Sequence, residues 1–140
     1  MIYLNLRPVL ASGCFDGIHL GHLRYLEAAR ELCHGGELFI VAVACDDYVV
    51  RAKGRRPRWT LDERIEALMR CGVADAVISH GPAGAADAIR FMRPRLFVKG
   101  RDWLRHMPAD VSEACGEVGA VIELVDSGVA KHTSDALSTQ

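Results

Sequence analysis

The sequence has no long hydrophobic run and almost no excess of one charge over the other. None of its apolar runs approaches the roughly 20 residues that a membrane-spanning helix needs, and the first residues lack the charged and apolar regions of a signal peptide. The formal net charge is −1 over 140 residues, so no overall field draws the protein to nucleic acid or to an anionic membrane. We therefore expect a cytoplasmic protein with no membrane or nucleic-acid partner.

Paired cysteines are also missing. The cysteines number five and include no C-x-x-C pair, which argues against a disulfide framework and against a zinc knuckle. We expect them to be small apolar residues of a reducing compartment.

Among the histidines, His34, His80 and His106 are expected at the surface, although His80 follows a predicted strand on the side where a substrate could bind.

What the sequence does contain is an alternation of short apolar runs with segments of helical periodicity. Strands are expected over 9–14, 38–44, 76–79, 96–98 and 120–125, and helices over 20–33, 60–70, 83–91 and 111–117, with a last one beginning near Thr133. The second of these helices opens with a Thr60…Glu63 capping box and stops at Gly72. The alternation predicts a single α/β domain over 1–140, Rossmann-like and doubly wound, with a parallel sheet covered by helices on both faces.

Two histidines follow the first expected strand. Residues 13–22 read G-C-F-D-G-I-H-L-G-H, which places His19 and His22 on one side of a helix start, with Gly21 between them. Ligands of parallel sheets bind beyond the carboxyl ends of the strands, and a helix N-terminus offers N–H groups to phosphate. The pattern alone leaves open phosphate binding, ordinary histidines and metal ligation, and no zinc-ligand pattern is completed nearby.

Four segments in register resemble the cytidylyltransferase-like nucleotidyltransferases. The first is the stretch 13–22, which resembles the family signature G-x-F-D…H-x-G-H. Lys53 followed by Arg64 resembles the family's lysine loop and E-x-R helix, residues 97–103 resemble its V-x-G-x-D-[WY] segment, and residues 132–135 resemble its terminal threonine motif. The resemblance implies strand order 3-2-1-4-5, which sets the first and fourth strands side by side.

The resemblance also implies a reaction and a division of roles. Members of the family join a nucleotide from an NTP to a phosphorylated sugar or polyol and release pyrophosphate, with Mg²⁺ held mostly by phosphate oxygens rather than by a protein metal site. We expect His19, His22 and Lys53 to be catalytic, and Lys53, Arg55 and Asp16 to meet the acceptor. The residues expected to bind the nucleotide are Cys14, Phe15, Gly21, Lys99, Asp102, Trp103, Thr133 and Ser134. We further expect a homodimer.

The substrate stays open at this point. Lys99 in V-K-G-x-D and Arg56-Pro57 resemble the heptose-1-phosphate adenylyltransferases, which use ATP. Trp103 and the short spacing from Lys53 to Arg64 resemble glycerol-3-phosphate cytidylyltransferase, which uses CTP. We favour the adenylyl prediction because of Lys99. A third hypothesis is a non-catalytic nucleotide-binding module, since fold does not fix function.

Overall fold

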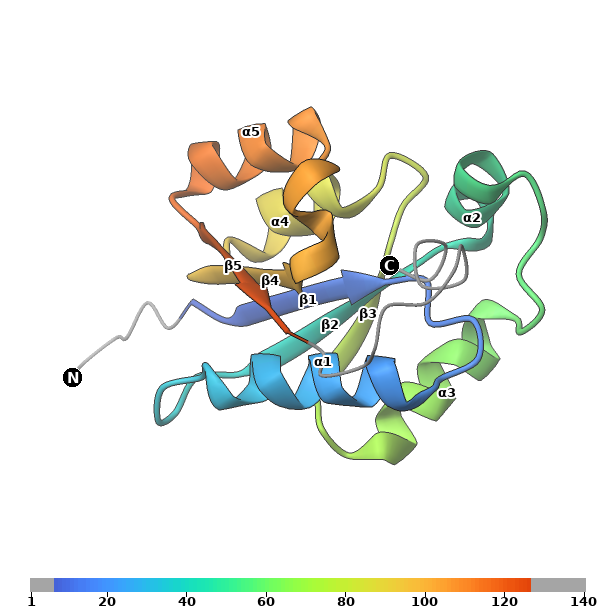
Figure 1. The fold of residues 1–140 in the computed structure, drawn as a ribbon, viewed down its shortest axis with the longest axis horizontal. Coiled ribbons are helices and arrows are strands. Elements are labelled where there is room, and N and C mark those ends of the chain that lie inside the picture. Colours follow the sequence, from blue (N-terminus) through green and yellow to red (C-terminus); the bar gives the residue numbers. More distant parts are fainter. Residues whose placement is uncertain (1–6, 127–140) are drawn as a thin grey trace.

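The computed structural model describes residues 7–126 and contains the predicted parallel sheet. Its five strands lie in the order β3-β2-β1-β4-β5 (Figure 1). The strands are β1 (Val9–Gly13), β2 (Phe39–Ala44), β3 (Ala76–His80), β4 (Leu96–Gly100) and β5 (Val121–Val125). The predicted order is confirmed, and β1 pairs with β2 on one side and with β4 on the other.

Helices cover both faces of the sheet, as predicted. Figure 1 shows α1 and α3 on one face and α4 and α5 on the other. These helices are α1 (Leu20–Glu31), α3 (Leu61–Cys71), α4 (Ala85–Met92) and α5 (Ala109–Val118). The three central strands, β1, β2 and β4, are buried on both sides and divide their side chains between two cores: Val9 and Ala11 pack with α1, whereas Leu10 packs with α4 and α5.

Local signals at α3 are confirmed. The Thr60 hydroxyl accepts from the Glu63 N–H at 3.1 Å, and the Glu63 carboxylate accepts from the Thr60 N–H at 2.8 Å. Gly72 ends the helix with a φ of +71°, a left-handed conformation that costs glycine little. The capping box and the stop residue therefore set both ends of α3.

Two short helices were not predicted. The helix α2 (Asp46–Lys53) follows β2 directly, and a 3-10 helix covers Arg101–Arg105 after β4. Only Val49 is buried in α2, so its eight residues carry too little apolar periodicity to be recognised. Both helices begin where a strand ends, so they stand at the carboxyl edge of the sheet.

Other expectations have mixed outcomes. The helix expected near Thr133 lies outside the described residues. Among the cysteines, Cys14 and Cys115 are buried and the other three are half-buried, all as free thiols. His80 was expected at the surface and is instead buried, because β3 ends against Tyr48 of α2. Between residues 7 and 126, no helix is long and apolar enough to cross a membrane.

Candidate active site at the start of α1

His19 and His22 form the N-terminal cap of α1. The Nδ1 atom of His19 accepts from the backbone N–H groups of Gly21 at 3.0 Å and of His22 at 3.4 Å. In return, the Nδ1 atom of His22 accepts from the His19 N–H at 3.1 Å. This is a capping box in which both side chains are histidines. The rings stack, with centroids 3.8 Å apart.

The cap decides which nitrogen of each ring carries the proton. An imidazole nitrogen that accepts a hydrogen bond has no proton of its own, so each neutral ring must carry its proton on Nε2. Nε2 lies on the side of the ring away from the helix amides. Each histidine therefore has an Nε2–H donor at a helix N-terminus, a place that suits the oxygens of a phosphate chain, and the Nε2 atom of His22 is buried.

Phe15 supports this pair from below. Its ring is buried, tilted against His22 with centroids 5.2 Å apart, and it covers Gly13 so closely that a Cβ there would lie 2.9 Å from Cε2. Phe15 also has a φ of +53°, a left-handed conformation that is costly for a large side chain. Its ring is therefore a packing element under His22, and its predicted contact with a nucleotide would have to come through its backbone. Cys14 is buried too, against Ala44 and Val49.

Lys99 joins the ends of β1 and β4. Its side chain is completely buried, its Nζ donates to the Ser12 carbonyl at 2.6 Å, and the ammonium lies 4.1 Å from the centre of the Trp103 ring. Burial lowers the pKa of Lys99 to about 7, although Cys14 and Asp102 oppose the shift. The histidine segment and the segment 97–103 therefore follow neighbouring strands and meet at one edge of the sheet, as the predicted strand order implied. A Cβ at Gly100 would lie 2.6 Å from the Asp102 carboxylate, so the Asp102 side chain would have to move.

The basic segment after α2 meets the histidine segment through Asp16. The Asp16 carboxylate accepts from the backbone N–H groups of Arg58 and Trp59, each at 2.9 Å, and pairs with Arg55 at 3.5 Å. Burial acts to raise the pKa of Asp16, but the amide and guanidinium hydrogen bonds outweigh it and the pKa is lowered. Lys53 ends α2 two residues before Arg55, whose guanidinium reaches Asp16 in the segment that leads into α1.

Arg64 was matched to a motif by sequence but assigned no role, and the structure gives it one. Its guanidinium is fully buried and donates to carbonyls of three separate segments and to one carboxylate. These acceptors are Cys14 O, Ala44 O, Trp59 O and Asp46 Oδ1. An arginine four residues after a capping threonine is ordinary in sequence, so its helical position alone could not reveal burial.

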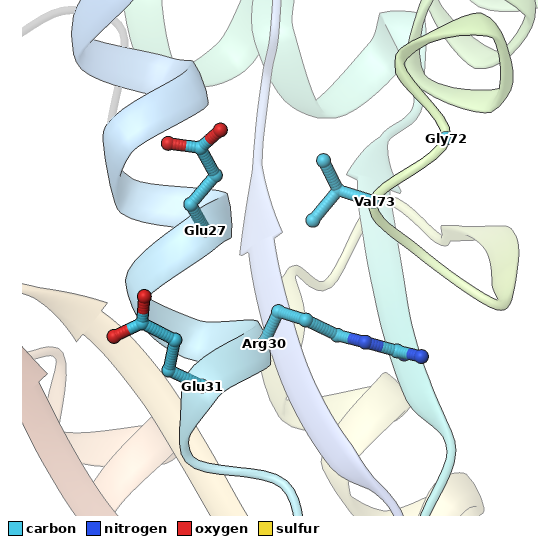
Figure 2. Close-up of a pocket in the computed structure, with 5 residues that line it drawn as sticks. All are labelled: Glu27, Arg30, Glu31, Gly72 and Val73. Atoms are coloured by element: carbon cyan, nitrogen blue, oxygen red, sulfur yellow. The ribbon is translucent and has the colours of Figure 1, made fainter.

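The remaining predicted residues are placed as follows. Gly21 is buried in the first turn of α1, and Asp102 and Trp103 stand in the 3-10 helix after β4. Thr133 and Ser134 lie outside the described residues. Figure 2 shows a different pocket, lined by Glu27, Arg30, Glu31, Gly72 and Val73. It lies at the far end of α1 from His19 and shares no residue with the predicted site.

Fold and site together define a class of protein: doubly wound α/β domains with a polar site at the carboxyl edge of the sheet, beside the helix that follows the first strand. A comparison with protein families gives the particular one. The cytidylyltransferase-like family matches residues 10–140, so the chain belongs to that family of nucleotidyltransferases and is an enzyme of that type.

Individual relatives agree with this assignment. The bifunctional protein HldE of Pseudomonas entomophila is 38% identical over 122 residues, covering 85% of this chain and 25% of the relative. HldE of Pseudomonas fluorescens Pf0-1 is 36% identical over 126 residues, covering 88% of this chain and 26% of the relative. This chain thus spans about a quarter of the length of these curated relatives.

Solved structures support the fold. A lipopolysaccharide core biosynthesis protein from Thermoplasma volcanium has a TM-score of 0.69 and 24% identity, covering 91% of this chain and 98% of that one. Pantoate-beta-alanine ligase from Francisella tularensis has a TM-score of 0.62 and 10% identity, covering 94% of this chain and 63% of that one. At these identities the likeness concerns the fold alone.

Proposed function

We propose that this protein transfers a nucleoside monophosphate from ATP to a phosphorylated sugar of the heptose-1-phosphate type and releases pyrophosphate. The observation that carries the proposal is the pair of Nε2 donors at the start of α1, fixed by the histidine capping box. Family membership supplies the reaction type, and the resemblance of Lys99 and Arg56-Pro57 to the adenylyl subgroup supplies the choice of substrates.

The chemistry suits a site built from cationic and N–H donors. The nucleophile is a phosphate oxygen of the acceptor, which is already mostly ionised near pH 7 because its second pKa is about 6. It attacks the α-phosphorus as the bond to the bridging oxygen breaks, and the electron pair leaves with pyrophosphate. No general base is needed. The barrier comes from bringing two anions together and from the charge that develops on the leaving group.

Each group then has a task. His19 and His22 donate through Nε2 to phosphate oxygens whose charge grows in the transition state. Lys53 and Arg55 hold the acceptor phosphate, and Thr133 and Ser134 bind the β- and γ-phosphates. Lys99 and Trp103 stand beside the nucleotide.

Mg²⁺ fits this arrangement as a companion of the triphosphate. Residues 7–126 hold no group of three or more His, Cys, Asp or Glu side chains that could bind a metal. Mg²⁺ usually keeps several waters and binds through substrate phosphates. It would neutralise the charge of the triphosphate when bound. The Asp16 carboxylate already accepts hydrogen bonds from the Arg58 and Trp59 amides.

A second candidate is CTP-dependent transfer to glycerol 3-phosphate. Trp103 favours it, since its ring is part of the site through its contact with Lys99 and takes the place of the tyrosine of the adenylyl pattern. A base is discriminated by hydrogen bonds to its edge, and a site built for one base leaves buried polar groups unpaired with another. The two candidates therefore differ by a measurable preference.

Pyrophosphate release decides between them. The purified protein is tested with ATP, CTP, GTP and UTP against heptose 1-phosphate, other sugar phosphates and glycerol 3-phosphate, with Mg²⁺ present. We expect turnover with ATP and a sugar 1-phosphate, and tighter calorimetric binding of ATP than of CTP. Turnover with CTP and glycerol 3-phosphate would select the second candidate, and absence of release from every pair would favour a non-catalytic module.

A further inference from the structure

Arg64 carries a full charge into the interior at the junction of four segments. Its Nη1 donates to Ala44 O at 2.6 Å and to Cys14 O at 2.9 Å, the carbonyls that follow or end two neighbouring strands. Its Nη2 donates to Asp46 at 2.6 Å, in the first turn of α2, and its Nε donates to Trp59 O at 3.1 Å. A buried charge is costly unless its hydrogen bonds are complete. Here the guanidinium donates to carbonyls at the ends of two strands, so its own hydrogen bonds are well supplied.

Asp16 makes the opposite link from the histidine side. It stands between β1 and α1, its side chain is only 4% exposed, and its two oxygens accept from the Arg58 and Trp59 amides. Trp59 is thus held twice: its N–H donates to Asp16 and its carbonyl accepts from Arg64. In Figure 1 the segment from α2 to α3 runs alongside the turn that leads into α1.

The segment held in this way carries the cations assigned to the acceptor phosphate. Lys53 precedes Gly54, whose φ of +75° turns the chain out of α2, and Arg55 follows. A long, flexible side chain contributes to catalysis only when its backbone is fixed, because a misplacement of about 1 Å can cost roughly 10²-fold in rate. Arg55 is 47% exposed and its contact with Asp16 is long, so it can turn to a phosphate without breaking the two amide bonds.

We propose that Asp16 and Arg64 are positioning residues, which lock the segment 53–59 against the segment that carries His19 and His22. They act through the backbone of Arg58 and Trp59 and do not touch the substrate. This inference rests on the proposed function, in which the acceptor and the nucleotide must be brought together. The contacts of Asp16 with the Arg58 and Trp59 amides, and of Arg64 with the Trp59 carbonyl, hold the two segments that do this. Asp16, which was predicted to contact the acceptor substrate, instead supports the segment that carries Lys53 and Arg55.

The chain offers a matched control for Asp16. Asp75 also accepts from a backbone N–H, that of Phe39 at 2.8 Å, and pairs with an arginine, Arg30, at 2.5 Å. It stands at the opposite edge of the sheet, where β2 and β3 begin. Asp75→Asn therefore removes the same chemistry at a place where no substrate residue depends on it.

The first measurement is hydrogen exchange of the Arg58 and Trp59 amides. In Asp16→Asn we expect both to exchange at least tenfold faster, and in Asp75→Asn to keep the wild-type rate. The second measurement is kinetic. Asp16→Asn should lower kcat/KM for the acceptor by about 10- to 100-fold, while calorimetric binding of the magnesium nucleotide changes by less than about threefold. Asp75→Asn should keep wild-type kinetics.

Arg64→Lys tests the contacts of Arg64, because an ammonium keeps the charge but cannot reach all four hydrogen-bond acceptors. We expect the same kinetic defect, and a double variant with Asp16→Asn that is little worse than the more severe single one, since both act on one segment. If Arg64→Lys does not fold, Asp16→Asn and its control still decide the question. Faster amide exchange with wild-type turnover would overturn the inference, as would an equal loss of nucleotide binding. Failure of the proposed function would show earlier, as a wild-type protein that releases no pyrophosphate.

Discussion

The rings of His19 and His22 stack with their centroids 3.8 Å apart and their planes 22° apart, and each ring uses Nδ1 to hold a backbone N–H of the same helix start. The relationship makes each histidine both a helix cap and a donor. Truncating either side chain therefore removes a helix cap and a hydrogen-bond donor at once, so further variants are needed to separate the two functions.

Replacing either histidine with alanine should lower kcat by about 10²–10³-fold, with a smaller change in nucleotide affinity, as for a donor lost from the transition state. His19→Asn is the informative partner, because asparagine caps a helix well but lacks the Nε2 donor. We expect His19→Asn to unfold at nearly the wild-type temperature yet to turn over as slowly as His19→Ala. Near-normal turnover in His19→Asn would assign His19 to capping alone.

Lys53 and Thr133 should give different kinetic defects. Lys53→Ala should chiefly raise KM for the phosphorylated acceptor, with some loss of kcat, because its cation meets the incoming phosphate. Thr133→Ala should chiefly weaken nucleotide binding measured by calorimetry. Arg70→Ala serves as the control, since this 78% exposed cation of α3 pairs only with Glu66 among the recorded ion pairs of residues 7–126. Identical defects in the first two variants would reject the separate roles.

The buried ammonium of Lys99 should make stability depend on pH. Burial lowers its pKa from 10.5 to about 7, so the native state releases a proton that the unfolded chain retains between those values. The cost of burying the charge is fully present below pH 7 and is relieved as the pH rises towards 10. The wild type should therefore gain stability relative to Lys99→Met over this range, by up to about 1.4 kcal/mol per pH unit. Urea unfolding at several pH values measures the difference, and parallel curves would contradict it.

Glu37 should contribute stability that acid removes. Its carboxylate accepts from Arg95 at 2.6 and 2.8 Å and from the His34 N–H at 2.7 Å. The Arg95 guanidinium is the main reason that its pKa falls from 4.5 to about 2. Glu37→Gln should cost about 1–3 kcal/mol at pH 7, and the difference should shrink as the pH falls from 4.5 towards 2.

The control for this measurement is Glu66→Gln. Glu66 and Arg70 form an exposed pair four residues apart on α3. Pairs of this kind contribute about 0.3–0.5 kcal/mol. A Glu37→Gln variant that loses as little stability as Glu66→Gln, at every pH, would show that the Arg95 contact does not stabilise the fold.

The sequence alone determined the order of strands and helices, both ends of α3 and the place of the histidine motif. These features follow from short-range rules: apolar periodicity, the Thr60…Glu63 cap, and glycines such as Gly72 that accept a left-handed turn. The family signature added strand order, which periodicity cannot provide, and the structure confirms it. The eight residues of α2 were missed because their pattern is too short, and it buries only Val49.

Only the tertiary structure decided what the polar side chains near the motif do. Three polar side chains are buried: Lys99, Arg64 and His80. Their neighbours in sequence do not predict this burial, because it depends on strands and helices many residues away. Lys99 reaches Ser12 across 87 residues and Arg64 reaches Cys14 across 50. Likewise, hydrogen-bond geometry determines which imidazole nitrogen of His19 and of His22 is the donor, and a residue pattern does not contain that geometry.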